Sequence, residues 1–363
     1  MRLAVFRQEE FFERYEFACR HMLALSGVEP LRHGELIALA GEGPPPSLEL
    51  GYTPSAGFPE LRAAIAALHP PAKAEHVIVT VGAIEALLIV MNLLLGAGDE
   101  LVCLWPSYQP LHELATAAGA HVRFAALDPR DGFRLTFDML REQLTDRTRL
   151  VVLNVPHNPT GRTLPADELR AFARELASRD IALLVDEVFR ELTPDHGPSA
   201  WDGSPNLLVA GGLSKAYGLP GLRIGWLVAA PELVVEARRF RKYTSLNPGA
   251  LDQAWALRVL ASRERVLART HKLAGEGRRH ALAWFAAHEQ HFELEPPESG
   301  ALLFPRLRSG EDTEGFCRRL VEQTGVLFAP GSACYEVEGH LRVGFATPQL
   351  ADGLERVAEH LAR

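Results

Sequence analysis

The residues with the clearest chemical potential are Lys215 and Arg223, which share the glycine-rich run GGLSKAYGLPGLRIGW. A lysine amine that is partly removed from water, or that lies beside another cation, becomes a nucleophile able to form a Schiff base. Arginine stays charged and suits the binding of a phosphate. Glycines let the backbone turn sharply and approach a ligand closely. The run therefore indicates an enzyme that holds a phosphorylated aldehyde through Lys215, with an ordinary lysine in a surface loop as the alternative.

Apolar runs precede the candidate residues and alternate with helical patterns. The runs are apolar on both faces, as strands between two helical layers are, and they cover residues 76–81, 100–105, 150–155, 181–186 and 207–212. Helical patterns cover residues 85–95, 110–118, 137–144 and 165–178. This alternation predicts an α/β fold with a mostly parallel central sheet and helices on both faces.

The same patterns divide the chain into three expected parts. Residues 1–45 form an N-terminal arm with a helix over residues 9–25, which the prolines of GEGPPPS separate from the sheet. Residues 46–248 form the large domain. Residues 249–363 form a smaller α+β domain, which starts with a long helical stretch over 250–288 and ends with a helix over 349–362.

The composition of the 363 residues, 47% hydrophobic and 23% charged, is that of a soluble globular protein. A net charge of −8 without a long basic run argues against nucleic-acid binding. The four cysteines are scattered, which indicates neither a metal site nor a disulfide framework and favours the reducing cytoplasm. Charged residues interrupt the apolar stretches, so we expect no membrane span.

Ligands of an open α/β sheet bind beyond the carboxyl ends of its strands. There, the turn at Ala83 and Ile84 enters a helix and offers free backbone amides to an anion. Tyr108 offers a ring for stacking, and Asn158 offers an amide donor. Asp186 offers a carboxylate for a protonated ring nitrogen. Asp186 and the glutamate after it also match the acidic pair of a P-loop NTPase, but the chain has no GxxxxGK[ST] motif.

In this order, the motifs resemble those of the class I/II aminotransferases, the fold-type I enzymes that use pyridoxal 5′-phosphate. The resemblance runs from residue 51 to residue 345 and is carried by GYTPSAGFPELR, PSY, NPTG, a DE pair after a strand, SKAYGLPGLRIGW and LRVGFA. It implies the transfer of an amino group between an L-amino acid and a 2-oxo acid. It also implies a homodimer with its active sites at the subunit interface.

The resemblance assigns a role to each candidate residue. It makes Lys215 the Schiff-base lysine, which also moves a proton at the substrate α-carbon. Asp186 pairs with the pyridinium nitrogen, Asn158 donates to the phenolic oxygen, and Tyr108 stacks on the ring. The phosphate is held by Ser214, Arg223, the amides of Ala83 and Ile84, and Tyr52 of the neighbouring subunit. Arg342, in LRVGFA, grips the substrate α-carboxylate beside Asn158.

Some of these residues also have plainer interpretations. Tyr52 and Tyr108 can be core aromatics, and Arg342 can be a surface cation at a strand edge. Three hydroxyl groups common in the family are missing, because Ile84, Phe189 and Gly212 stand at their positions. The loss of phosphate donors predicts a loosely held cofactor. The loss of the donor at Phe189 predicts a Schiff base that stays protonated to higher pH than in a Phe189→Tyr variant.

The N-terminal segment SGVEPLRHGELIALAGEGPPP also departs from the family pattern and is weakly similar to capreomycidine synthase-like enzymes. Within this segment, Glu29 or Glu35 can meet a basic side chain of the substrate, unless the segment only docks against the partner subunit. Elsewhere in the chain, Lys242 can meet an acidic side chain of the substrate. The alternative reaction is therefore elimination, replacement, cyclisation or oxidation of an amino acid, basic ones included, on the same cofactor. A non-catalytic sensor built on this fold is a third hypothesis, which the joint presence of the candidate residues disfavours.

Overall fold

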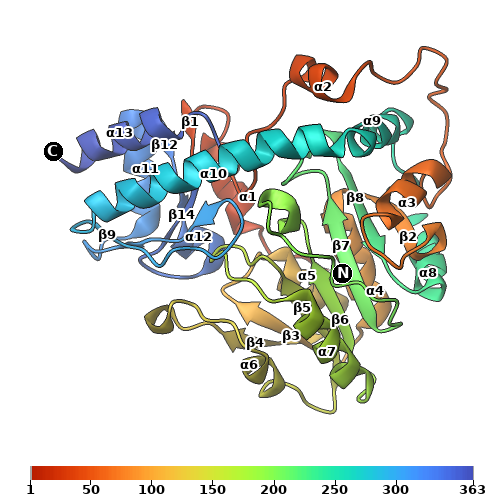
Figure 1. Cartoon of the computed structure of the whole chain (residues 1–363). Coiled ribbons are helices and arrows are strands. Elements are labelled where there is room, and N and C mark those ends of the chain that lie inside the picture. The colour runs from red at the N-terminus through yellow and green to blue at the C-terminus, as the bar shows by residue number, and fades with distance from the viewer. Residues whose placement is uncertain (1, 363) are drawn as a thin grey trace.

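A seven-stranded sheet organises the largest part of the chain, in a computed structural model that describes residues 2–362 (Figure 1). In spatial order its strands are β2 (Val77–Val81), β8 (Ile224–Val228), β7 (Leu207–Gly212), β6 (Ala182–Asp186), β5 (Thr148–Asn154), β3 (Glu100–Trp105) and β4 (His121–Ala126). Strand β8 runs antiparallel to β2 and β7, and the other pairs are parallel. The predicted α/β fold is confirmed. Strand β4 was not predicted, because this half-exposed edge strand lacks a continuous apolar run.

Helices cover both faces of the sheet, and successive strand residues point into two separate cores. Ile78 and Leu101 pack with α4 (Gly82–Leu94), α5 (Pro110–Ala118) and α8 (Pro231–Arg241). Val79 and Val102 belong to the larger core, which includes α3 (Pro59–Ala66), α6 (Phe137–Arg141), α7 (Ala166–Ala177) and α9 (Ala250–Ala261). The central strands are therefore apolar on both faces, which explains the runs in the sequence.

A long helix, α10 (Arg263–Ala287), connects this part to a C-terminal unit that contains the elements β9 to α13 (Figure 1). The predicted helical stretch 250–288 is two helices, because the backbone leaves the helical conformation at Ser262. The unit contains β9 (Phe292–Glu293), β10 (Leu302–Leu303), β11 (Arg306–Leu307), α11 (Thr313–Thr324), β12 (Val326–Leu327), β13 (Ala329–Pro330), α12 (Gly331–Tyr335), β14 (Leu341–Gly344) and α13 (Leu350–Leu361). Strands β10, β14 and β13 form a small antiparallel sheet.

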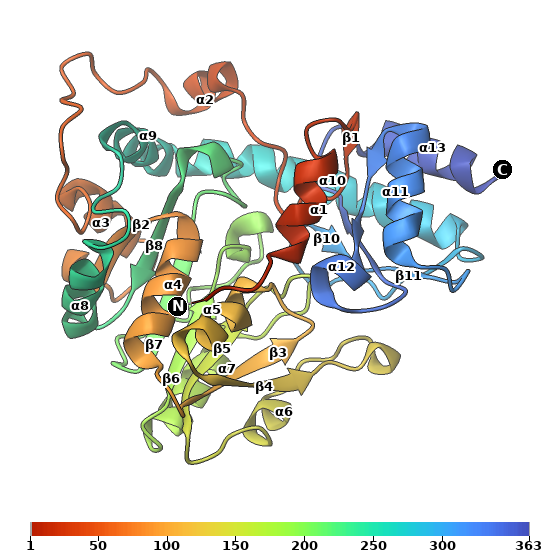
Figure 2. The same cartoon turned by 180° about the vertical axis from the view of Figure 1, so that it is seen from behind.

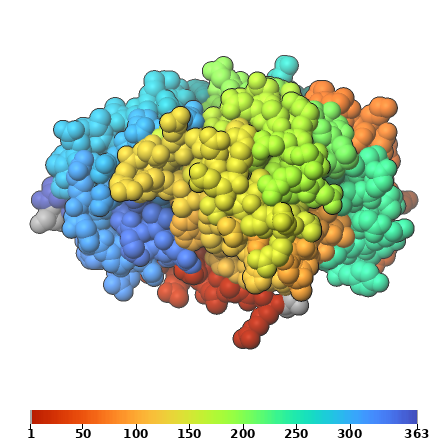
Figure 3. Space-filling model, turned by 90° about the horizontal axis from the view of Figure 1, so that it is seen from below, coloured from red at the N-terminus to blue at the C-terminus, as the bar shows by residue number. Residues whose placement is uncertain are grey.

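The first part of the N-terminal arm lies between the large sheet and the C-terminal unit, whereas its last helix lies beside α9 and α10 (Figure 2). Its first helix, α1 (Arg7–Tyr15), is followed by β1 (His21–Met22) and later by α2 (His33–Ala40). The predicted helix over residues 9–25 was wrong beyond Tyr15, because β1 pairs in parallel with β12 and ties the arm to the C-terminal unit. Seen from below, the red N-terminal segment runs along one face where the blue C-terminal unit meets the rest of the molecule (Figure 3).

Between residues 2 and 362, the chain has no helix with both the length and the apolar character that a membrane span requires.

Candidate active site

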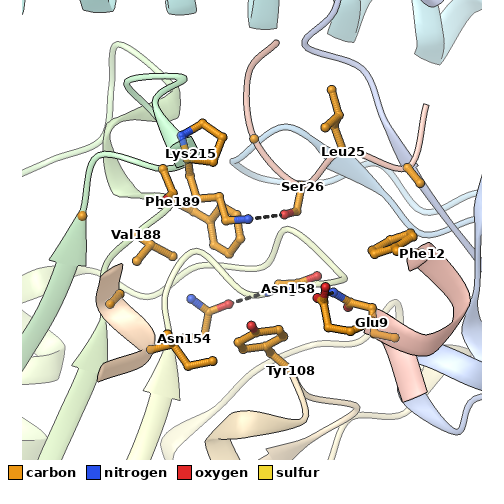
Figure 4. Close-up of a pocket in the computed structure, with 18 of the residues that line it drawn as sticks. Glu9, Phe12, Leu25, Ser26, Tyr108, Asn154, Asn158, Val188, Phe189 and Lys215 are labelled. Carbon is orange, nitrogen blue, oxygen red and sulfur yellow. Dashed lines mark hydrogen bonds between the residues drawn. The ribbon is translucent and has the colours of Figure 1, made fainter. Parts of the chain in front are cut away.

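A cavity of about 540 Å³ lies at the carboxyl ends of the parallel strands, where the large sheet, the arm and β14 meet (Figure 4). Nine of the ten residues predicted for the site line it: Ala83, Ile84, Tyr108, Asn158, Asp186, Ser214, Lys215, Arg223 and Arg342. They come from segments that are far apart in the sequence. The rule that ligands bind at the strand ends thus located this cavity.

The Lys215 side chain extends from the loop after β7 into this cavity. Its Nζ donates a hydrogen bond to Ser26 Oγ (2.7 Å) and lies 5.9 Å from the centre of the Phe189 ring (Figure 4). Burial is the main cause that lowers the pKa of Lys215 to about 8, and the positive charge of Arg342 adds to it. A sizeable fraction of the amine is therefore unprotonated near neutral pH, as a nucleophile requires.

Asp186 ends β6 and is only 4% exposed. Its Oδ1 accepts a hydrogen bond from the backbone N of Val188 (3.2 Å). Burial raises the pKa of this carboxyl to about 7, and the charge of Lys215 offsets part of that rise. A carboxylate held out of water in this way is stabilised by a cationic N–H partner, such as a protonated aromatic nitrogen.

Asn154 holds the ends of β5 and β6 in place. Its Nδ2 donates to the carbonyl oxygen of Asp186 (3.0 Å), and its Oδ1 accepts from the backbone N of Asn158 (2.9 Å). Asn158 lines the cavity and is only 4% exposed. The Asn154 side chain thus positions both of these predicted residues.

An anion cradle lies at the start of α4. Gly82 has a positive φ of 70°, and a Cβ on it would lie 2.6 Å from Nη2 of Arg223. A side chain at this position would make that guanidinium shift, and the positive φ itself favours glycine. The amides of Ala83 and Ile84 are among the first N–H groups of a helix, which have no partner within it, and the helix dipole favours negative charge there. The residue types of this cradle fit a phosphate.

Arg342 lies on β14 and is 2% exposed, so it is not a surface cation at a strand edge. Its Nη2 donates to the carbonyl oxygen of Ala24 (2.7 Å). Its Nη1 donates to Gln8 Oε1 (3.2 Å) and to the hydroxyl oxygen of Tyr335 (2.5 Å). Within residues 2–362, its buried Nε has no hydrogen-bond partner, and this donor suits a carboxylate ligand.

The two tyrosines of the predicted site differ in their surroundings. Tyr108 lines the cavity, and its ring makes an edge-to-face contact with Phe6 of the arm, with 5.7 Å between the ring centres. Tyr52 is 89% exposed, so it is not a core aromatic. It does not line the cavity of its own chain.

The arm contributes residues that the sequence did not indicate. Glu9 and Glu16 place two carboxylates on the cavity. Ser26 supplies the hydroxyl group bonded to Lys215 (Figure 4). Burial raises the pKa of Glu16, and the charge of Glu9 raises it further. The only sequence signal for α1 was its helical pattern, which does not tell what its polar side chains face.

The charged residues that the sequence did single out near the substrate lie elsewhere. Glu35 accepts a hydrogen bond from the backbone N of Arg32 (2.8 Å) at the start of α2. Glu29 Oε1 accepts from Gln349 Nε2 (3.4 Å) in the C-terminal unit. Lys242 is exposed at the end of α8. None of Glu29, Glu35 and Lys242 lines the cavity.

A reactive lysine, a buried carboxyl at a neighbouring strand end and an anion cradle on this sheet define the class of fold-type I pyridoxal-phosphate enzymes. Residues 47–361 match the family model described as aminotransferase class I and II. The chain is 37% identical to capreomycidine synthase of Streptomyces vinaceus over 357 residues, which cover 96% of this chain and 91% of that protein. It is 30% identical to a probable N-acetyl-LL-diaminopimelate aminotransferase of Bacillus subtilis (strain 168), over 84% of this chain and 80% of that protein.

Solved structures agree with these matches. A PLP-dependent aminotransferase from Streptococcus suis 89-1591 superposes with a TM-score of 0.93 at 28% identity, over 100% of this chain and 99% of that chain. The PLP-dependent cyclase OrfR superposes with a TM-score of 0.91 at 30% identity, over 100% and 98%. The chain belongs to the class I and II aminotransferase family, and its cofactor is pyridoxal 5′-phosphate.

The residues of the cavity fit this cofactor. The cradle at α4 suits its phosphate, the buried carboxyl of Asp186 suits its ring nitrogen, and the amine of Lys215 suits its aldehyde. The three departures from the family pattern also lie here. Ile84 is 37% exposed, and a Cβ on Gly212 would lie 3.8 Å from the backbone N of Ala83. Both positions therefore border the cradle without offering it a hydroxyl group.

Ile84→Ser is expected to tighten the cofactor by about tenfold, because one new hydrogen bond to a charged group contributes about 1.5–3 kcal/mol before the cost of ordering the side chain. The measurement is the dissociation constant of pyridoxal 5′-phosphate from fluorescence titration of the cofactor-free protein. Ile84→Ala is the control, because it removes the same bulk without adding a donor. Equal affinities of the serine and alanine variants would refute the role of the hydroxyl group.

Proposed function

We propose that this enzyme transfers the amino group of an L-amino acid to a 2-oxo acid. The observation that carries the proposal is that Lys215, Asp186 and Arg342 face one cavity, with a lowered pKa on the amine and a raised pKa on the carboxyl. This combination supplies a base, a partner for a cationic ring nitrogen and a grip on a carboxylate. The aminotransferases among the relatives support the transfer reaction.

When bound, pyridoxal 5′-phosphate supplies the electron sink for negative charge at the substrate α-carbon. Lys215 would hold the aldehyde of this cofactor, and the Lys215 amine, when free, would remove and return the proton at the substrate α-carbon. Asp186 would keep the ring nitrogen protonated, and Asn158 would donate to the phenolic oxygen. Arg342 would orient the substrate by its carboxylate, and Tyr108 would stack on the ring of the cofactor.

The phosphate site completes the assignment of roles. The amides of Ala83 and Ile84, the Ser214 hydroxyl and the Arg223 guanidinium would hold the phosphate. These four residues would fix the cofactor by its phosphate.

Cyclisation or elimination of a basic amino acid is the second candidate. Glu9 and Glu16 give the cavity two carboxylates, and neither forms an ion pair with an arginine or lysine in the described part of the chain. A cationic substrate side chain suits them. The names of two similar proteins, capreomycidine synthase and the cyclase OrfR, support the same alternative.

A single-turnover experiment separates the two reactions. The loaded enzyme is mixed with one equivalent of an amino acid, and the protein-bound cofactor and the small-molecule product are analysed by mass spectrometry. Transamination leaves the amino group on the cofactor and releases a 2-oxo acid. Elimination or cyclisation returns the aldehyde form and releases a product altered in its side chain. Screening arginine-like, acidic and aromatic amino acids in parallel identifies the substrate class.

We also propose a homodimer in which Tyr52 reaches the phosphate site of the partner subunit. Leu50 is 77% exposed and Tyr243 is 93% exposed. A hydrogen bond from Thr53 Oγ1 to the carbonyl oxygen of Pro248 (2.9 Å) holds the segments of these side chains together. Large apolar side chains that are exposed on neighbouring segments suit an interface.

Tyr243→Glu is expected to shift the protein toward monomers, because it places a charge on an apolar interface. Sedimentation velocity over a range of concentrations measures the shift. Tyr243 follows α8, which contacts β2 at one edge of the sheet. Phe124→Glu introduces the same charge on β4, at the other edge, and should leave the dimer intact. A Tyr243→Glu protein that remains fully dimeric at low concentration excludes this surface.

The division of the chain into three parts and its location in the cytoplasm belong to the same proposal. We propose that the chain consists of an arm (residues 1–45), a large domain (residues 46–248) and a small domain (residues 249–363). The four cysteines are free thiols, as they would be in the reducing cytoplasm.

A further inference from the structure

Tyr335 joins two residues of the candidate site without lining the cavity itself. It is the last residue of α12 and is 2% exposed. Its hydroxyl oxygen accepts from Arg342 Nη1 (2.5 Å), and its hydroxyl group donates to Asn158 Oδ1 (2.7 Å). The residue predicted to grip the substrate and the residue predicted to hold the cofactor are therefore connected through one hydroxyl group.

The donor capacities of the three groups set the direction of both hydrogen bonds. A guanidinium only donates, so the Tyr335 oxygen is the acceptor toward Arg342. The single hydroxyl proton of Tyr335 is then donated to Oδ1 of Asn158. Because its oxygen faces Tyr335, Asn158 keeps its two N–H donors for the cavity, which it lines.

The orientation of the Asn158 amide matters more in this chain because of Phe189. The Phe189 ring is buried and its centre lies 5.9 Å from Lys215 Nζ, where it offers no hydroxyl group. Under the proposed function, Asn158 is then the side-chain donor to the phenolic oxygen of the cofactor. An amide turned around would present its oxygen to that phenolate and repel it.

We propose that Tyr335 is a positioning residue that holds the Asn158 amide with its N–H donors toward the cofactor and couples this orientation to Arg342. The inference rests on the proposed function. Substrate binding at Arg342 and the electronic state of the cofactor are then linked through three side chains. The hydroxyl remains a donor at all working pH values, because burial raises the pKa of Tyr335 to about 12.

The test compares the pH midpoint of the visible absorbance of the loaded enzyme in the wild type and in Tyr335→Phe. The variant keeps the ring that packs against Phe304, with 5.7 Å between the ring centres, and loses only the hydroxyl group. The midpoint reports the protonation of the cofactor-bound Lys215 nitrogen, and an unpaired phenolate favours the protonated form. We expect it to rise by about half to one pH unit, the equivalent of one ordinary hydrogen bond.

Two further variants make the result specific. Tyr217→Phe also removes a buried hydroxyl group, which donates to Glu191 Oε2 (2.7 Å), and is expected to leave the midpoint unchanged. In a Phe189→Tyr background, the new tyrosine is expected to donate a second hydrogen bond to the phenolate of the cofactor. Tyr335→Phe should then shift the midpoint by less than half of the shift that it causes in the wild type.

The inference is overturned if Tyr335→Phe leaves the midpoint unchanged, or if Tyr217→Phe shifts it equally. Borohydride reduction of the wild type is run alongside. A cofactor adduct on Lys215 together with an unmoved midpoint refutes the role of Tyr335 alone, whereas the lack of an adduct refutes the proposed function as well.

Discussion

Replacing Lys215 by alanine is expected to lower turnover by about 10⁴-fold or more, because the variant loses both the nucleophile and the base that moves the α-proton. The pKa of about 8 of this amine in the cavity suits both roles near neutral pH. Turnover is measured once the substrate is known. Binding of the cofactor is measured independently, by borohydride reduction followed by peptide mass spectrometry. The wild type should carry the reduced cofactor on Lys215, and the variant should carry none.

Lys242→Ala is the matched control, because Lys242 is an exposed lysine outside the cavity. It should retain the activity and the adduct of the wild type. An adduct on another lysine, or a Lys215→Ala protein with activity within tenfold of the wild type, would refute the assignment of this residue.

Replacing Asp186 by asparagine is expected to lower turnover by about 10²–10³-fold, the range for losing one electrostatic group in a dry active site. Asparagine has nearly the same shape but carries no charge, so the ring nitrogen loses the partner that keeps it protonated. The measurements are turnover and the affinity for the cofactor. Asp195→Asn, at an exposed aspartate outside the cavity, is the control and should match the wild type in both.

The same substitution should stabilise the cofactor-free protein in a pH-dependent way. Burial raises the pKa of Asp186 from 3.8 to about 7, so between these values the folded state binds more protons than the unfolded state. The free energy of unfolding of the wild type therefore falls as pH rises through this window. A shift of about three pKa units corresponds to ~4 kcal/mol in the free energy of unfolding. At pH 8, Asp186→Asn should therefore be more stable than the wild type by this amount, and below pH 4 the two proteins should not differ in this way.

Urea denaturation of the cofactor-free proteins at pH 4, 6 and 8 measures this difference. A stability gain that is the same at all three pH values would show that the asparagine acts through packing. Loss of stability at pH 8 would show that the carboxylate of Asp186 is already paired in the folded protein.

Much of the large sheet and of the candidate site could be predicted from the amino-acid sequence because these features leave local patterns. A strand buried on both faces must be apolar throughout, and a residue that follows it lies at the ligand-binding edge, as Asp186 and Asn158 do. The glycine-rich run around Lys215 and Arg223 is equally local. Strand β4 escaped prediction because an edge strand need not be apolar.

Only the tertiary structure decided which other side chains reach the cavity. The bond from Lys215 to Ser26 spans 189 positions and the bond from Tyr335 to Asn158 spans 177. Contacts between such distant segments depend on how the arm and the C-terminal unit pack on the sheet, and packing leaves no periodic pattern in either segment. For this reason the sequence alone indicated Glu29 and Glu35 as candidate carboxylates of the arm, whereas the fold brings Glu9 and Glu16 to the cavity.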